Sequence, residues 1–164
     1  MRASASVARR SQIKMLSIFL TSYLLAALTV CIHAAGIAIL LRRWIRLGAR
    51  TPTSFWAITL MLLHMIWWLI LLHLAEISIW ALFYLWRGCL PNAEAAFYFS
   101  GVTYTTVGYG DLVLAKPWRL LAPLEGLVGV LMCGLSMGYF FVVVNRIHQR
   151  QPLRVIAGSA TDEK

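Results

Sequence analysis

The stretch that decides the fold is Thr105-Thr106-Val107-Gly108-Tyr109-Gly110-Asp111. It is polar and rich in glycine, and it lies between long apolar runs. Irregular backbone at membrane depth is tolerated only where it is buried in protein or lines a water-filled cavity. We therefore expect residues 105–111 to line a cavity in a membrane protein rather than to form a surface turn.

The composition places the chain in a membrane. Of its 164 residues, 60% are hydrophobic and 13% are charged, which is too apolar for an ordinary soluble domain. A helix needs about 20 mainly apolar residues to span a bilayer. Three runs satisfy this requirement: residues 15–41, 55–86 and 118–145. The second run would be about 48 Å long as a helix, so it predicts one long or tilted span. The expected fold is an all-α membrane protein with three transmembrane helices.

A shorter helix is expected directly before the loop. Pro91-Asn92-Ala93-Glu94 is typical of a helix start, with a proline, a capping asparagine and an acid in the first turn. The apolar and aromatic residues 95–104 follow and would cover only about 15 Å, too little to cross a membrane. Residues 92–104 therefore predict a re-entrant half-length helix. The negative end of its dipole would point at the loop and favour a cation there.

Thr-Val-Gly-Tyr-Gly at residues 106–110 resembles the selectivity filter of potassium channels. Short motifs recur by chance, but here the motif follows a half-length helix and lies between two full spans. The resemblance covers the two-helix pore module of that family, residues 55–150. It implies an outer helix at 55–86, a pore helix at 92–104, a filter at 105–111 and an inner helix at 118–145. The first span, 15–41, is an additional helix outside the resemblance.

The resemblance implies that backbone carbonyls replace the hydration shell of K⁺. Gly108 and Gly110 supply the backbone freedom that aligning these carbonyls needs. One chain gives one carbonyl per layer, so the resemblance also implies a homotetramer. K⁺ is then the permeant ion, and neither a catalytic residue nor another cofactor is expected. The residues implied in K⁺ binding are Thr106, Val107, Gly108, Tyr109 and Gly110.

Neighbouring side chains are expected to support the filter: Thr105, Asp111, Tyr98, Phe99 and Val102. The resemblance implies that Tyr109 packs against Tyr98 and Phe99, and that Asp111 accepts a hydrogen bond behind the filter. Well-known bacterial channels donate that bond from a tryptophan where this chain has Tyr98, and a phenol can donate it too. Val102 occupies a position where some channels carry a buried glutamate, so that carboxylate pair is absent.

The third span is expected to line the pore cavity. Resemblance to inner helices, together with helical spacing, puts four residues on one face: Val130, Cys133, Met137 and Phe141. The competing interpretation of each is ordinary packing. Gly129 is a candidate hinge, and Phe141 a candidate constriction at the gate. Gly134 and Gly138 form a small-xxx-small pair, which favours close approach of another helix.

Two carboxyl groups fall inside the apolar runs, near the depth of the loop. Buried Glu76 and Glu125 would be costly there, so each is a candidate for modulation, in a network behind the filter or as a pH sensor. The competing interpretation is a structural hydrogen bond, for Glu76 to Thr21, Ser22 or Tyr23. His33 and His64 fall at similar depths, but two histidines without further ligands favour packing over a metal site. The three cysteines have no metal-ligand spacing.

The basic residues suggest an orientation. A filter facing outward puts Arg42, Arg43, Arg46 and Arg50, in a basic linker at 42–54, in the cytoplasm, as the positive-inside rule requires. This cluster is also a candidate contact for anionic lipids. The basic tail, residues 1–14, would then lie outside, against the rule. A translocated tail and a start at Met15 both remain open, whereas a cleaved signal peptide would invert the second span. Residues 151–164 are expected to form a short cytoplasmic tail.

The sequence predicts a potassium-selective channel of the cell (cytoplasmic or inner) membrane, multi-pass and not an enzyme. No span carries arginine at every third position, so no voltage sensor is expected. The formal charge of +9 belongs to the membrane edges and does not indicate nucleic-acid binding. Two alternatives stay open: a weakly selective cation channel, and a non-conducting subunit of a larger channel or transporter complex.

Overall fold

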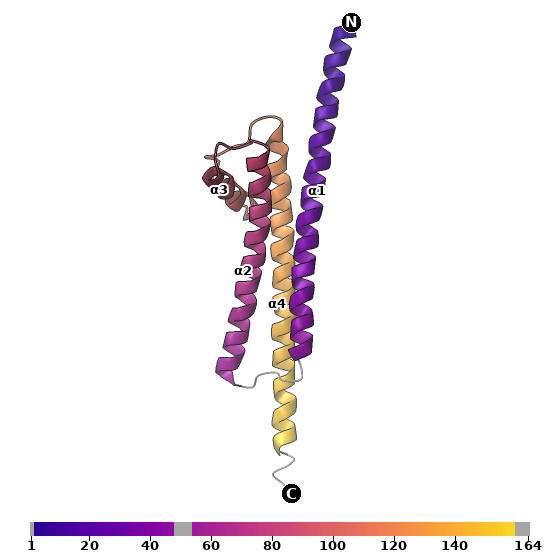
Figure 1. The fold of residues 1–164 in the computed structure, drawn as a ribbon. Helices are drawn as coiled ribbons and strands as arrows, with labels where there is room; N and C mark the ends of the chain where they lie inside the picture. The colour runs from indigo at the N-terminus through magenta and orange to yellow at the C-terminus, as the bar shows by residue number, and fades with distance from the viewer. Residues whose placement is uncertain (1, 48–53, 160–164) are drawn as a thin grey trace. The chain divides into compact units, whose positions relative to one another are not determined.

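A computed structural model describes residues 2–47 and 54–159, and this part of the chain is helical without any strand. The elements in chain order are α1 (Arg2–Leu47), α2 (Phe55–Trp86), α3 (Ala93–Tyr104), the short 3₁₀ helix η1 (Trp118–Leu120) and α4 (Leu121–Ser159) (Figure 1). Three segments are long and apolar enough to span a membrane: Met15–Arg46, Phe55–Trp86 and Trp118–Ile147. The protein is therefore an all-α, multi-pass membrane protein.

The helix ends differ from the sequence-based expectation at both termini. α2 covers the same residues as the second apolar run, but α1 extends beyond residues 15–41 in both directions. No glycine or proline lies between Arg2 and Ala35, so nothing in the tail stops the helix. Arg42, Arg43 and Arg46 are thus the end of α1 rather than part of a linker, and Arg50, with the rest of 48–53, lies outside the described residues.

α4 is also longer than predicted. It continues to Ser159, so most of the expected tail at 151–164 is helical, and 160–164 lies outside the described residues. The chain divides into two compact units, each of which is treated separately below. Unit 1 combines Met1–Ala34 with His73–Met132, and unit 2 combines Ala35–Leu72 with Cys133–Lys164.

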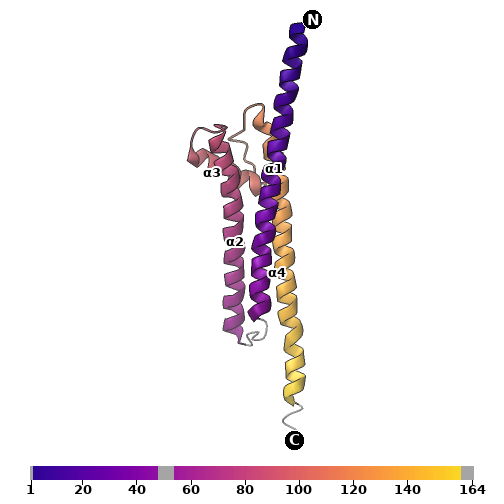
Figure 2. The same cartoon turned by 45° about the vertical axis from the view of Figure 1, so that its right-hand side comes forward.

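Unit 1 contains α3 and the loop that follows it. In both Figure 1 and Figure 2, α3 lies beside the C-terminal end of α2 and the N-terminal part of α4. The buried core here includes Trp80, Tyr84, Phe99, Leu114 and Leu121. Trp80 Nε1 donates to Thr29 Oγ1 at 3.1 Å. Burial of these large rings contributes to the packing of α3.

α3 begins where the sequence predicts. The Asn92 side-chain oxygen accepts a hydrogen bond from the Ala95 amide at 2.8 Å, and Glu94 lies in the first turn. This cap satisfies one of the amides that a helix start leaves unpaired. α3 has 12 residues and ends at Tyr104, so its C-terminal end leads directly into the loop. The predicted half-length helix is present.

Unit 2 has its own small core, formed by Leu40, Met65, Leu69, Tyr139 and Val143 among others. Its helices approach closely at Gly36, where an added Cβ would overlap the side chain of Leu72. The guanidinium of Arg146 lies 5.6 Å from the centre of the Trp44 ring, a cation–π distance. Trp44 and Arg146 lie near the ends of the two apolar spans Met15–Arg46 and Trp118–Ile147, and such a pairing of a basic with an aromatic side chain is common at membrane interfaces.

Candidate functional site

The loop after α3 has an unusual backbone. The φ angle is positive at Thr106 (62°), Gly108 (50°) and Gly110 (79°), that is, at every second residue. In an ordinary strand, successive carbonyls alternate in direction. Positive φ at alternate positions breaks that alternation, and this is what aligning successive carbonyls toward one axis requires. The two glycines adopt such angles without cost, as the sequence predicts.

The positive φ angle of Thr106 was not expected from the sequence. A β-branched residue at positive φ is a true outlier and costs about 1–3 kcal/mol. The Thr106 amide donates to the Thr103 carbonyl at 3.0 Å, and the Gly108 amide donates to the Val102 carbonyl at 3.0 Å. These bonds end α3 in the left-handed conformation that glycine usually supplies. A threonine held in this position suggests a role for its hydroxyl.

The loop side chains are exposed in the single chain, with 52% of Val107 and 72% of Tyr109 accessible. The expected packing of Tyr109 against Tyr98 and Phe99 stays a prediction. The Phe99 ring lies 5.3 Å from the Tyr84 ring, edge to face. Tyr109 makes no ring contact with any residue in the described ranges. One chain therefore lacks the groups that would cover this side of the loop.

The expected hydrogen bond behind the loop is present. Tyr98 donates its phenol hydrogen to Asp111 Oδ2 at 2.8 Å. This bond raises the pKa of Tyr98 above its ordinary value, so the phenol keeps its hydrogen and remains a donor at neutral pH. The bond joins the middle of α3 to the end of the loop, so residues 105–110 lie between its two partners in the sequence.

A cavity of about 540 Å³ lies between the loop and α4. Its lining includes Phe99 and Val102, which were predicted to support the filter, and Val130, which was predicted to line the cavity. Thr106 and Gly110 also line it. The other predicted cavity residues, Cys133, Met137 and Phe141, are all exposed on α4. Exposed apolar side chains of this size on a membrane helix are available for contact with lipid or with other chains.

The glycines of α4 have different packing roles from those that the sequence predicted. A Cβ added at Gly129 would overlap the Tyr104 carbonyl oxygen, so this glycine lets α4 pack directly on the end of α3. The interpretation of Gly129 as a hinge did not include its contact with Tyr104. The packing predicted for Gly134 and Gly138 is absent among the described residues, because an added Cβ would have nothing within 4 Å at either position.

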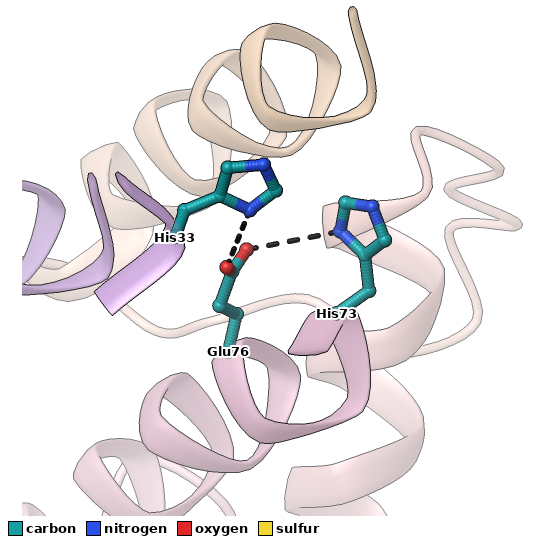
Figure 3. A group of neighbouring side chains, drawn as sticks. All are labelled: His33, His73 and Glu76. Atoms are coloured by element: carbon teal, nitrogen blue, oxygen red, sulfur yellow. Dashed lines mark hydrogen bonds and ion pairs between the residues drawn. The ribbon is translucent and has the colours of Figure 1, made fainter. Parts of the chain in front are cut away.

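Glu76 is the centre of a buried polar cluster that we call the Glu76 cluster: His33, His73, Glu76 and Tyr104 (Figure 3). His33 Nδ1 donates to Glu76 Oε1 at 2.7 Å, and the Tyr104 hydroxyl donates to Glu76 Oε2. His73 Nδ1 lies 2.9 Å from the Tyr104 hydroxyl oxygen and 3.8 Å from Glu76 Oε2. The cluster therefore links α1 and α2 to the last residue of α3.

These contacts correct the predicted partners of Glu76. Thr21 and Ser22 donate to carbonyls of their own helix, at Ser17 and Ile18, and Tyr23 is exposed. The partner on α1 is His33 instead. His33 faces His73, with ring centres 5.3 Å apart, whereas His64 is exposed.

Glu125 forms a second buried cluster, the Glu125 cluster, with Tyr84 and Ser100. Tyr84 donates to Glu125 Oε2 at 2.6 Å, and Ser100 Oγ lies 2.5 Å from Glu125 Oε1. Ser100 Oγ also lies 2.9 Å from the Ile77 carbonyl oxygen. Glu125 therefore joins α4 to the middle of α3 and to α2. Both predicted carboxyl groups lie beside α3, and their modulatory role stays a prediction.

The fold and the loop define the class: a helical membrane protein with a half-length helix and a glycine-rich loop between two spans. Residues 70–146 match the family model described as "Ion channel". The matched region covers the second part of α2, α3, the loop and most of α4, but not α1. No curated protein and no solved structure matches the chain.

Proposed function

We propose that the protein is a potassium-selective channel that conducts K⁺ passively through a filter formed by residues 106–110. The observation that carries the proposal is the run of positive φ angles at Thr106, Gly108 and Gly110, in a loop anchored to the end of α3. The ion-channel match at 70–146 supports conduction, and the Thr-Val-Gly-Tyr-Gly motif supports K⁺ as the ion.

The electrostatics of unit 1 favour a cation at the loop. α3 has no basic residue in its last turn, so its negative dipole end is uncompensated there. Backbone carbonyls of residues 106–110 would replace the water around K⁺, and the Thr106 hydroxyl would add an oxygen at the inner mouth. Conduction of this kind needs no catalytic residue and no cofactor besides the permeant ion.

The proposed assembly is a homotetramer. A coordination cage needs several carbonyls per layer, and one chain offers one. The exposure of Val107, Tyr109, Met137 and Phe141 supports this, because a ring of four chains would cover such surfaces. The exposed Arg42, Arg43 and Arg46 at the end of α1 are proposed to face the cytoplasm and anionic lipid headgroups.

The test is ion flux into liposomes that contain the purified chain, under a K⁺ gradient and separately under a Na⁺ gradient. Selective K⁺ flux supports the proposal. Equal Na⁺ and K⁺ flux would make the protein a weakly selective cation channel, and no flux would make it a non-conducting subunit.

A pair of glycine substitutions sharpens this experiment. Gly108 and Gly88 both have positive φ with nothing within 4 Å of an added Cβ, but only Gly108 lies in the filter. Replacement by alanine strains either backbone by roughly 1–2 kcal/mol. Gly108→Ala is expected to abolish selective flux, and Gly88→Ala to preserve it. Equal flux in both variants would contradict the assignment of the filter.

A further inference from the structure

Three side chains of ligand type converge within the Glu76 cluster. His33 comes from α1, whereas His73 and Glu76 lie one helical turn apart on α2 (Figure 3). One ligand atom from each lies within 4.8 Å of the other two. His33 and Glu76 are fully buried, and 19% of the His73 side chain is exposed. Buried ionisable groups at membrane depth are expensive, so a cluster of three calls for a functional explanation.

We propose that His33, His73 and Glu76 bind a divalent transition-metal ion, with Zn²⁺ as the best fit. Two imidazole nitrogens and one carboxylate oxygen form a ligand set that zinc uses in proteins, with a water molecule in the fourth position. Imidazole disfavours Mg²⁺ and Ca²⁺, which prefer oxygen ligands. The site is separate from the filter and does not depend on K⁺ conduction.

The distances suit an ion of this size. Zn–N and Zn–O bonds of about 2.0–2.1 Å put the ligand atoms of a tetrahedral site roughly 3.3 Å apart. In the cluster, Nδ1 of His33 lies 2.7 Å from one Glu76 oxygen, and Nδ1 of His73 lies 3.8 Å from the other. These separations bracket the tetrahedral value. Completing the site requires the side chains to rotate until the three ligand atoms, which now lie within 4.8 Å of one another, surround one ion.

His73 supplies the third candidate ligand atom of the proposed site. Glu76 already accepts hydrogen bonds from His33 and Tyr104. His73 Nδ1 lies 2.9 Å from the Tyr104 hydroxyl oxygen and 3.8 Å from Glu76 Oε2, so an ion shared by the three ligands would replace its hydrogen bond to Tyr104. Ligation requires both histidines to carry their hydrogen on Nε2, which neutral imidazole allows.

Tyr104 is the positioning residue of the proposed site. Its hydroxyl donates to Glu76, and partners of this kind orient a ligating carboxylate and strengthen metal binding. Tyr104 is also the last residue of α3. A bound ion would therefore join α1, α2 and the start of the loop at one point.

The test uses the full chain, purified in detergent, stripped with a chelator and then titrated with Zn²⁺ alone. We expect one Zn²⁺ retained per chain after desalting, and a tetrahedral visible spectrum when Co²⁺ replaces Zn²⁺. His73→Gln, at the least buried ligand, is expected to weaken Zn²⁺ binding by at least 10–100-fold, and Tyr104→Phe by about 10–100-fold. His64→Gln, an exposed histidine on the same helix, is the matched control and is expected to bind Zn²⁺ as the parent chain does.

Two results would overturn the proposal. One is a parent chain that retains no more Zn²⁺ than His73→Gln, which would leave the cluster as a hydrogen-bonded network only. The other is an equal loss of Zn²⁺ in His64→Gln, which would indicate non-specific histidine binding. Because neither measurement uses ion flux, failure of this site and failure of the proposed channel function can be told apart.

Discussion

The Glu76 cluster and the Glu125 cluster both attach α3 through a fully buried carboxyl group, but they surround that group with different chemistry. The close neighbours of Glu76 act as donors: the His33 ring and the Tyr104 hydroxyl. Glu125 has one clear donor, Tyr84, and a shared one, Ser100, whose single hydroxyl hydrogen also faces the Ile77 carbonyl.

The number of hydrogen-bond donors around each carboxyl group indicates whether that group acts only as an acceptor or also as a donor. A carboxylate only accepts, whereas a protonated carboxyl also donates. Glu76 is satisfied as an acceptor on both oxygens. When Ser100 gives its hydrogen to Ile77, its contact with Glu125 is a hydrogen bond only if Glu125 donates. The same residue type therefore works as a pure acceptor at the end of α3 and can work as both donor and acceptor at its middle.

The largest effect is expected from Glu76→Ala. This substitution leaves the buried donors of His33 and Tyr104 without their acceptor, and each unsatisfied buried donor costs about 1–3 kcal/mol. The free energy of unfolding, measured from denaturant titration in detergent, should fall by the cost of both donors. Glu94→Gln, at an exposed position on α3, should change it by less than about 0.5 kcal/mol. Equal effects would mean that the cluster does not stabilise the fold.

Glutamine at both positions compares the clusters directly. Glu125→Gln keeps a donor for Ser100 and an acceptor for Tyr84, so we expect a loss of less than about 1 kcal/mol. Glu76→Gln puts an amide donor against a donor and should cost about 2–3 kcal/mol. The free energies of unfolding of the two variants, measured by the same denaturant titration, are compared. A larger loss at Glu125 than at Glu76 would reverse the assignment of acceptor and donor roles.

A smaller effect is expected from Gly129→Ala, which tests whether packing as well as hydrogen bonding holds the Tyr104 end of α3. The added methyl group would overlap the Tyr104 carbonyl, and overpacking typically costs about 1–3 kcal/mol. Gly134→Ala enters open space and should be neutral or slightly stabilising, since alanine favours helix. If Gly129→Ala were as stable as Gly134→Ala, packing against Gly129 would not contribute to holding the Tyr104 end of α3.

Local features of the sequence were sufficient for the spans, for α3 and for the two glycines of the loop, but not for the positive φ of Thr106. Apolar runs of about 20 residues, the cap at Asn92 and the need for glycine at positive φ each act over a few neighbouring residues. The hydrogen bond of Tyr98 to Asp111 was anticipated from the resemblance to potassium channels. The extra length of α1 was missed because its basic tail is a good helix former that is polar rather than apolar.

The partners of the two buried glutamates depend on contacts that the sequence does not fix. His33 and Glu76 are 43 residues apart, and they meet only because α1 and α2 pack in one particular register. The predicted partner Ser22 lies 11 residues from His33, which is about 16 Å along a helix. A shift of three turns leaves every local pattern unchanged. The role of Gly129 was missed for the same reason, because its contact lies on another helix.

The position of His33 on α1 affects whether the matched region could be transferred to another protein without α1. The ion-channel match begins at residue 70, yet one hydrogen-bond donor to its buried Glu76 comes from α1, far upstream. A graft of residues 70–146 into another scaffold would bring the carboxylate without that donor. The matched region and α1 therefore share one buried hydrogen-bonded cluster, and a graft that keeps this cluster has to include the first helix.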